Sequence, residues 1–236
     1  MNSKVLLSFL LTFSILQSPL AQYDGYSSKN WKKQIEIEKE FLGHIDLNSF
    51  KKHLKKLTER PHVVGSKENE KVQNYMANVM KNAGFEVKNY PYDLYLPNKP
   101  GSSLIEIVTP SREILNQKED IIISDPYSND PLLWKGWNAF SGSGDITSNV
   151  VYANYGRKED FEKLKELGIE IKGKIVIARY GGNFRGFKAK FAESFGASGL
   201  IIYTDPKDNG FTKGLVYPEG PYYNKSTIQR GSLLTT

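Results

Sequence analysis

The residue with the clearest chemical potential in this sequence is Arg185, which stands in the short motif Phe184-Arg185-Gly186. A predicted strand and two glycines precede it, and a predicted helix follows it. Loops at the carboxyl end of a strand and the start of a helix commonly bind ligands in open α/β sheets. A guanidinium beside a helix N-terminus suits a carboxylate or a phosphate. The position predicts an anion site, and a surface ion pair is the alternative interpretation.

None of the usual catalytic or metal-binding patterns accompanies this arginine. The three histidines, His44, His53 and His62, form no HExxH motif, and the chain has no cysteine. No serine lies in a GxSxG elbow, and neither a P-loop nor a GxGxxG motif occurs. We therefore predict no catalytic residue and no metal ligand in this chain.

The arginine motif lies inside a predicted strand–loop–helix–strand unit that runs from Lys172 to Pro206. Lys174 to Arg179 is a short β-branched run bounded by glycines, which is typical of a buried strand. Large apolar residues recur at four-residue spacing from Phe187 to Phe195, which predicts an apolar stripe on a helix. Leu200 to Tyr203 is a second predicted strand. The two strands should be parallel, as in other βαβ units.

The part of the chain before this unit is predicted to start with helices. Trp31 to Leu42 is the first helix, and Asp46 and Ser66 are suitable N-caps for two more. Phe85 to Leu96 alternates loosely and is predicted to be a strand. The Pro- and Gly-rich stretch from Pro97 to Gly101 marks the clearest domain boundary.

Beyond that boundary the pattern changes to short strands and one helix. The stretch from Asp125 to Gly144 is irregular but rich in aromatic residues, so we expect it to be pinned against a domain surface. After Pro206 the chain is predicted to be loop-like. The remaining predicted elements are strands at Leu104–Thr109, Ile121–Ser124 and Asn149–Ala153 and a helix at Lys158–Leu167.

Composition excludes some classes of protein. The chain has 236 residues with a net charge of +6, but it has no long basic run and no basic motif mixed with stacking aromatics, so we predict no nucleic-acid partner. Residues 1–21 combine Lys4, an apolar core and the small residue Ala21 before a cleavage position, which is typical of a secretory signal peptide. An uncleaved anchor is the alternative. We expect an exported, periplasmic or extracellular protein without a stable membrane span.

Several motifs together resemble a known family, the glutamate carboxypeptidase II-like proteins, which include folate hydrolase and transferrin receptor. The resemblance runs from about Phe50 to the end of the chain. The motifs that carry it, in chain order, are Pro61–Ser66, Asn154–Phe161, Gly173–Gly181, Phe184–Gly186, Gly199–Pro206 and Gln229–Gly231.

The resemblance implies an α/β fold and a zinc-dependent exopeptidase with two zinc ions in the full-length protein. Residues 22–49 would be an N-terminal linker and helix, and 50–96 the start of the peptidase domain. Residues 97–236 would be an incomplete protease-associated (apical) domain with a mixed sheet and flanking helices. The family's zinc ligands would lie after this domain, so this chain alone should bind no zinc and be inactive. A homodimer is expected only of the full-length protein.

The resemblance also assigns substrate-binding roles. Arg185 would bind the C-terminal carboxylate of a small peptide, and Phe184 would line the same pocket. The family has an asparagine directly after Gln-Arg-Gly, where this sequence has Ser232. A hydroxyl reaches less far than an amide, so a strict preference for C-terminal glutamate does not follow.

Two non-catalytic alternatives remain open at the level of sequence. One is a transferrin-receptor-like binding protein, against which the Phe184-Arg185-Gly186 motif argues, because a receptor needs no clamp for a substrate carboxylate. The other is a free-standing protease-associated module, against which the peptidase-like residues 50–96 argue.

Overall fold

The structure is a computed structural model that describes residues 25–27 and 29–235. The predicted signal peptide, residues 1–21, lies outside the described residues. The chain divides into two compact units, Met1–Lys56 and Leu57–Thr236. Each unit is described by itself.

The first unit is helical where it is described. Helix α2 (Trp31–Gly43) matches the first predicted helix. Helix α3 (Leu47–Leu57) begins after Asp46, whose carboxylate oxygens accept from the backbone N–H groups of Asn48 (3.0 Å) and Ser49 (3.1 Å). The predicted N-cap at Asp46 is therefore confirmed.

The first complete helix of the second unit is α4 (Lys67–Asn82), which begins directly after the predicted N-cap Ser66. The Ser66 hydroxyl accepts from the Asn69 backbone N–H at 3.1 Å, and Glu68 and Glu70 lie in the first turn, where carboxylates suit the helix dipole. Gly84 follows the helix with φ of +89°, a conformation that favours glycine at a helix end.

The strand predicted at Phe85–Leu96 is wrong. This segment is irregular, and side chains such as Tyr92 and Tyr95 are almost fully exposed. Alternation shows that a segment could form a strand, but its backbone groups also need a partner strand. No strand of the described residues supplies one here.

The region after Gly101 contains less strand than predicted. The strand predicted at Leu104–Thr109 is present only as the shorter β1 (Glu106–Ile107), which pairs antiparallel with β2 (Glu113–Ile114). Ile121–Ser124 is not a strand, and Ile123 lies exposed.

The aromatic stretch from Asp125 to Gly144 is pinned to the unit as expected. Arg60 forms an ion pair with the buried carboxylate of Asp130 at 2.8 Å. Arg230 donates to the Trp134 carbonyl at 3.1 Å and forms an ion pair with Glu119 at 3.0 Å.

A short strand in this stretch was not predicted. Strand β3 (Asn138–Ala139) pairs parallel with β7 (Gly231–Ser232), so the last part of the chain is not purely loop-like. A four-residue helix, α7 (Pro206–Asn209), begins at Asp205, whose carboxylate accepts from the Lys207 backbone N–H at 2.9 Å.

The centre of the second unit is a three-stranded parallel sheet in the order β4-β5-β6. Its strands are β4 (Val150–Tyr152), β5 (Ile175–Arg179) and β6 (Gly199–Tyr203), and Val176 is aligned with Val151 on one side and Leu200 on the other. The predicted parallel βαβ unit is confirmed.

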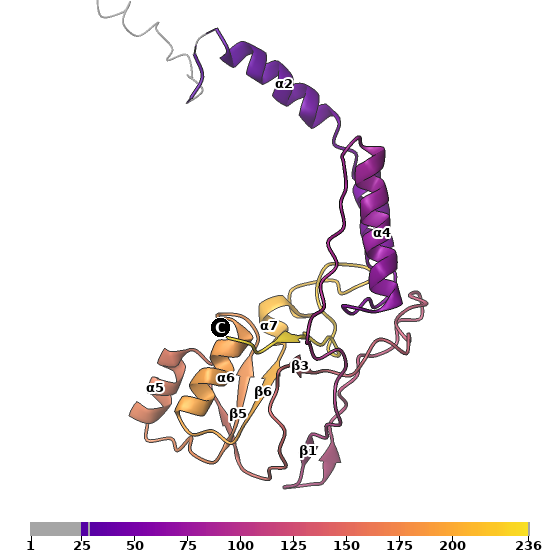
Figure 1. Cartoon of the computed structure of the whole chain (residues 1–236). Coiled ribbons are helices and arrows are strands. Elements are labelled where there is room, and N and C mark those ends of the chain that lie inside the picture. The colour runs from indigo at the N-terminus through magenta and orange to yellow at the C-terminus, as the bar shows by residue number, and fades with distance from the viewer. Residues whose placement is uncertain (1–24, 28, 236) are drawn as a thin grey trace, which may run out of the picture. The chain divides into compact units, whose positions relative to one another are not determined.

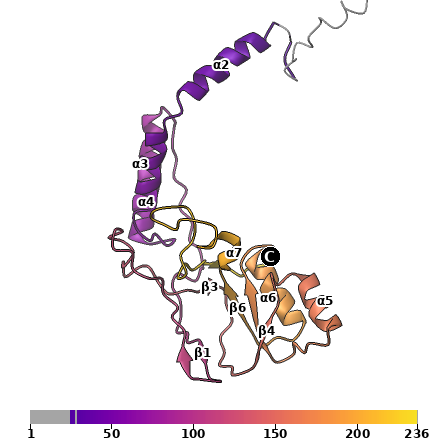
Figure 2. The ribbon, with the colours of Figure 1, turned by 180° about the vertical axis from the view of Figure 1, so that it is seen from behind.

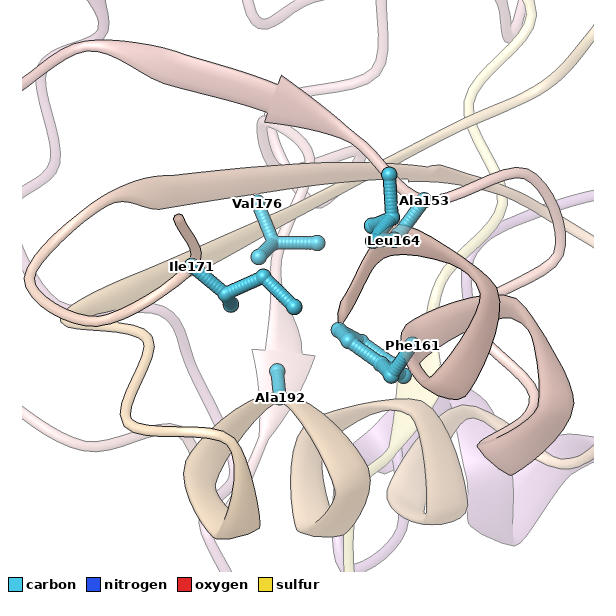
Figure 3. Packing of buried hydrophobic residues seen from close by; sticks show 6 residues of the cluster. All are labelled: Ala153, Phe161, Leu164, Ile171, Val176 and Ala192. Atoms are coloured by element: carbon cyan, nitrogen blue, oxygen red, sulfur yellow. The ribbon is translucent and has the colours of Figure 1, made fainter. Parts of the chain in front are cut away.

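Two helices cover one face of this sheet (Figures 1 and 2). Helix α5 (Lys158–Glu166) joins β4 to β5, and α6 (Arg185–Ser194) joins β5 to β6. Side chains from both helices and from the sheet point toward one another in the core (Figure 3). The buried cluster comprises Ala153, Phe161, Leu164, Ile171, Val176 and Ala192.

The apolar stripe predicted on α6 is shifted around the helix. Phe195 stacks on Phe161 with ring centroids 5.3 Å apart, and Phe191 packs against the core. Phe187 instead lies exposed, while Lys188 and Ala192 occupy the buried side. A buried lysine on this side cannot be predicted from the spacing of apolar residues.

The predicted α/β class is confirmed: the chain contains helices together with both parallel and antiparallel strand pairs. In the part of the chain that the structure describes, no helix combines the length and apolar character that crossing a membrane requires.

Candidate functional site

The loop between β5 and α6 presents Arg185 at the first turn of the helix. Gly181 and Gly182 have φ of +93° and +75°, in the left-handed region. A Cβ on Gly182 would lie 2.8 Å from the Tyr155 side chain, so a larger residue would not fit. The two glycines therefore let the chain turn sharply from the strand into the helix while it lies close to its neighbour.

Arg185 is held by a few neutral contacts. Its Nη1 donates to the Tyr180 hydroxyl at 3.0 Å. Its guanidinium carbon lies 5.6 Å from the ring centroids of both Tyr180 and Phe184. A Cβ on Gly231 would overlap the guanidinium, so the charged group lies directly against the β7 backbone. These contacts fix the position of the charge but do not neutralise it.

No carboxylate of the described residues forms an ion pair with Arg185. Four other arginines do have carboxylate partners: Arg60, Arg112, Arg179 and Arg230. In addition, Arg185 Nε is buried and has no hydrogen-bond partner among the described residues. A half-buried cation with an unused donor is suited to an anionic ligand.

Asn138 lies in the strand that pairs with β7, whose Gly231 contacts this guanidinium. It is aligned with Gly231 in the parallel β3–β7 pair, and paired residues project from the same face of a sheet. Since a Cβ on Gly231 would point at Arg185, the Asn138 side chain lies on the face that Arg185 covers. Its Oδ1 is buried and has no partner within the described part of the chain.

Arg185 and Asn138 both line a cleft of about 1150 Å³. Tyr180, Tyr203 and Gln229 line it as well, together with the free edge of β6. The cleft therefore combines a guanidinium, an amide and aromatic hydroxyls at the carboxyl end of parallel strands.

The other two predicted substrate-binding residues lie beside Arg185, not on the cleft wall. Phe184 precedes it as the N-cap residue and is 40% exposed. Ser232 lies in β7, one residue after the Gly231 that contacts the guanidinium, and its Oγ accepts from the Leu234 backbone N–H at 3.0 Å. The structure thus brings the three predicted residues into one neighbourhood.

A second polar cluster lies at the same end of the sheet. Arg179 stacks over the Tyr155 ring at 4.0 Å and forms ion pairs with Asp205 (3.6 Å) and Asp208 (3.8 Å). The Tyr155 hydroxyl donates to Asp208 at 2.8 Å, and this hydrogen bond raises the pKa of Tyr155.

Asp205 is also held in its charged form. The Tyr203 hydroxyl donates to it at 2.7 Å, and this bond and the Lys207 N–H lower the pKa of Asp205. Burial, with the bond to Asp205, raises the pKa of Tyr203. Because its charges pair with one another, this cluster is built to hold the loops together.

The described residues contain no group of three His, Asp or Glu side chains that could hold a metal ion. His62 lies exposed with Nδ1 2.9 Å from the Arg60 carbonyl oxygen, and His44 is exposed on the other unit.

Sequence reasoning pointed to Arg185, which lines the cleft, but it did not point to Tyr180, Asn138 or Lys188. Tyr180 directly follows a strand and could have been suspected from that position. Asn138 reaches the site only through a pairing of β3 with β7 across a long sequence separation, for which the local pattern gives no sign.

Comparisons with known proteins agree with this geometry. The PA domain family model matches residues 143–230, which include the sheet, both covering helices and the arginine loop. The PA domain predicted from the motifs is therefore confirmed.

Three curated relatives are peptidases by name. A glutamate carboxypeptidase 2 homolog of Caenorhabditis elegans is 36% identical over 201 residues, which is 81% of this chain and 26% of that protein. A probable glutamate carboxypeptidase of Arthroderma benhamiae is 38% identical over 178 residues, covering 73% and 24%. Aminopeptidase NAALADL1 of Mus musculus is 29% identical over 206 residues, covering 81% and 27%. The chain spans about a quarter of the length of these relatives.

Proposed function

We propose a function for this chain from one premise: it is a glutamate carboxypeptidase II-like sequence that contains a PA domain. In our proposal it is part of an exported, zinc-dependent carboxypeptidase that hydrolyses small peptides. The chain's own contribution is Arg185, which binds the C-terminal carboxylate of the substrate. Export rests on the predicted signal peptide at residues 1–21.

The observation that carries the proposal is the unpaired guanidinium of Arg185 in the cleft. It has an unused, buried Nε donor and no carboxylate partner among the described residues. A carboxylate can accept two parallel N–H bonds from a guanidinium. The surface ion-pair interpretation finds no support in these contacts.

The charge of the site favours a carboxypeptidase over an aminopeptidase. An exopeptidase recognises the free end of its substrate, which is an ammonium at the N-terminus and a carboxylate at the C-terminus. Arg185 would repel an ammonium and attract a carboxylate. The neutral groups beside it, Tyr180 and Asn138, leave this preference unchanged.

Two zinc ions belong to the proposal as the cofactor of the full-length protein, where they would activate the attacking water. No ligand for them is assigned within this chain, because the described residues contain no suitable cluster. We expect the 236-residue chain alone to bind no zinc stoichiometrically and to be inactive. A homodimer remains an expectation for the full-length protein only.

The test compares Arg185→Ala with the unmodified enzyme in the full-length protein. Loss of a hydrogen-bonded charge pair should weaken binding by about 1.5–3 kcal/mol, or roughly tenfold to 150-fold. The loss should appear mainly in KM, because the carboxylate is charged in the ground state and the transition state alike. Arg185→Lys should recover only part of it, because an ammonium lacks the planar fork.

A substrate with an amidated C-terminus completes a double-mutant cycle. Amidation should weaken the unmodified enzyme about as much as Arg185→Ala does, yet weaken the alanine variant little more. Lys190 is an exposed lysine on the same helix, so Lys190→Ala is the matched control. It should leave kcat/KM unchanged for both the free and the amidated substrate. If the two losses simply add, Arg185 does not contact the carboxylate. A full-length protein that binds no zinc and cleaves no peptide would favour the non-catalytic alternatives.

A further inference from the structure

Lys188 is a fully buried lysine on α6, with none of its surface exposed. It lies one helical turn after Arg185, on the side of the helix that faces the sheet. Removing an ammonium from water is costly unless other groups replace its hydration. Its partners therefore indicate why it is there.

The Lys188 ammonium has three hydrogen-bond acceptors, which matches its three N–H donors. It donates to the Tyr155 carbonyl, to the Gly181 carbonyl at 2.6 Å and to Asn183 Oδ1 at 2.6 Å. Gly181 and Asn183 belong to the loop that leads into Arg185. Tyr155 belongs to the loop between β4 and α5.

Asn183 extends this link between the two loops. Its Oδ1 accepts from Lys188, while its Nδ2 donates to the Gly156 carbonyl at 3.2 Å. Gly156 has φ of +62°, and a Cβ there would lie 3.3 Å from the Lys188 side chain. Glycine at this position lets the lysine stem pass between the loops.

The charged groups that face Lys188 are Asp160 and Arg157, both from the segment after Gly156. Their effects on the ammonium are opposite in sign. The direct partners of the ammonium are therefore the three oxygens that accept its hydrogen bonds, which we call the cage.

We propose that Lys188 is a positioning residue for Arg185: its caged ammonium fixes the Gly181–Asn183 loop and so holds the guanidinium at the cleft. This inference rests on the proposed function for the role of Arg185, but not for the cage itself. The loop needs such a support because two of its residues are glycines in the left-handed region. Among the described residues, the Arg185 side chain makes one hydrogen bond, and its partner Tyr180 lies on the same loop.

The first part of the test is independent of activity. We would measure backbone order parameters of Gly181, Gly182 and Asn183 by NMR in the chain and in Lys188→Met. Methionine preserves the length of the side chain but removes all three donors. The order parameters should fall from about 0.85 toward 0.6 or below.

Two further variants keep this measurement interpretable. Asn183→Ala removes one acceptor and should produce a smaller change in the same loop, even if Lys188→Met folds poorly. Leu164→Ala destabilises the core without touching the loop, so the order parameters should stay high. Unchanged order parameters in both loop variants would overturn the proposal.

The second part of the test uses the full-length enzyme. Lys188→Met should raise KM for a substrate with a free C-terminal carboxylate by about 10- to 100-fold, the scale of a misplaced binding group. KM for the amidated substrate and kcat should change little. A merely structural role would instead affect both substrates equally.

Arg185→Ala, measured alongside, separates this inference from the proposed function. If Arg185→Ala shows a carboxylate-selective loss and Lys188→Met does not, Lys188 does not position Arg185. If neither variant shows a carboxylate-selective loss, the proposed function fails. The order parameters then still decide whether the lysine holds the loop.

Discussion

At the scale of single residues, the second unit contains two arginines at one end of a sheet, one with carboxylate partners and one with neutral neighbours. Arg179 is paired with Asp205 and Asp208 and stacked on Tyr155. Arg185 has no carboxylate partner among the described residues. Pairing of this kind is typical of a structural role, whereas the unpaired Arg185 is the residue to which our proposal assigns ligand binding.

This contrast predicts different stabilities for two alanine variants. Arg179→Ala leaves two partly buried carboxylates without their counter-charge, so the free energy of unfolding should fall by about 1–3 kcal/mol. Arg185→Ala leaves no carboxylate of the described residues without its partner, and its effect should stay below about 1 kcal/mol. Urea unfolding of both variants in the chain measures the difference. Equal losses would mean that Arg185, too, is part of the structural framework.

Sequence alone could single out Arg185 as a candidate because its signal is local: a glycine loop after a strand and before a helix. The same reasoning could not separate it from Arg179, since both lie near the end of β5. That difference depends on carboxylates from the segment after β6, which only the folded sheet brings close. Asn138 was unpredictable for the same reason.

At the scale of elements, predictions succeeded where the determinants are local. The caps at Asp46 and Ser66, the helix α5 and the β5–α6–β6 unit all follow from neighbouring residues. The strand predicted at Phe85–Leu96 failed because it required a partner strand that the described residues do not supply. Local alternation is necessary for a strand but does not provide its hydrogen bonds.

The buried Lys188, which links α6 to its two neighbouring loops, should make the free energy of unfolding depend on pH. Burial lowers the pKa of Lys188 from 10.5 to about 8. Between these two values the unfolded chain holds a proton that the folded chain has released. Stability therefore rises with pH in this window, by at most ~3 kcal/mol.

The measurement is urea unfolding at several pH values from 7 to 10, with Lys188→Met as the reference. The difference in unfolding free energy between the chain and the variant should increase above pH 8 in favour of the chain. Tyr155 and Tyr203 do not interfere, because raised tyrosine pKa values lower stability only above about pH 10. A difference that stays flat from pH 7 to 10 would mean that the three oxygens keep the ammonium charged in spite of burial.

At the scale of the whole molecule, the second unit differs along its length in buried core and in secondary structure. Its PA-domain part has a continuous buried core around Phe161 and Val176. The segment between Gly84 and Gly101 has neither helix nor strand in the structure. This segment also contains the boundary predicted at residue 97 between peptidase and apical parts.

Limited proteolysis with chymotrypsin should therefore cut this segment first. Tyr92, Leu94 and Tyr95 have exposed fractions of 78%, 66% and 103%, and their backbone is free to enter a protease active site. Tyr90 and Leu96 are also exposed, but a proline follows each of them and blocks cleavage. Phe85 is exposed too, but its backbone N–H donates to the Met80 carbonyl of α4 at 3.1 Å, so we expect its cleavage later.

The first large products should therefore begin at Asp93, Tyr95 or Leu96, as mass spectrometry would show. The segment containing α5, β5 and α6 should resist for longer, because Phe161 and Val176 are inaccessible until the core opens. Substituting Tyr92, Leu94 and Tyr95 together by serine should remove these early cuts without changing the unfolding transition of the core. Early cleavage beside Phe161 would instead mean that the PA-domain core opens as readily as the exposed segment. The two parts would then have similar free energies of local opening.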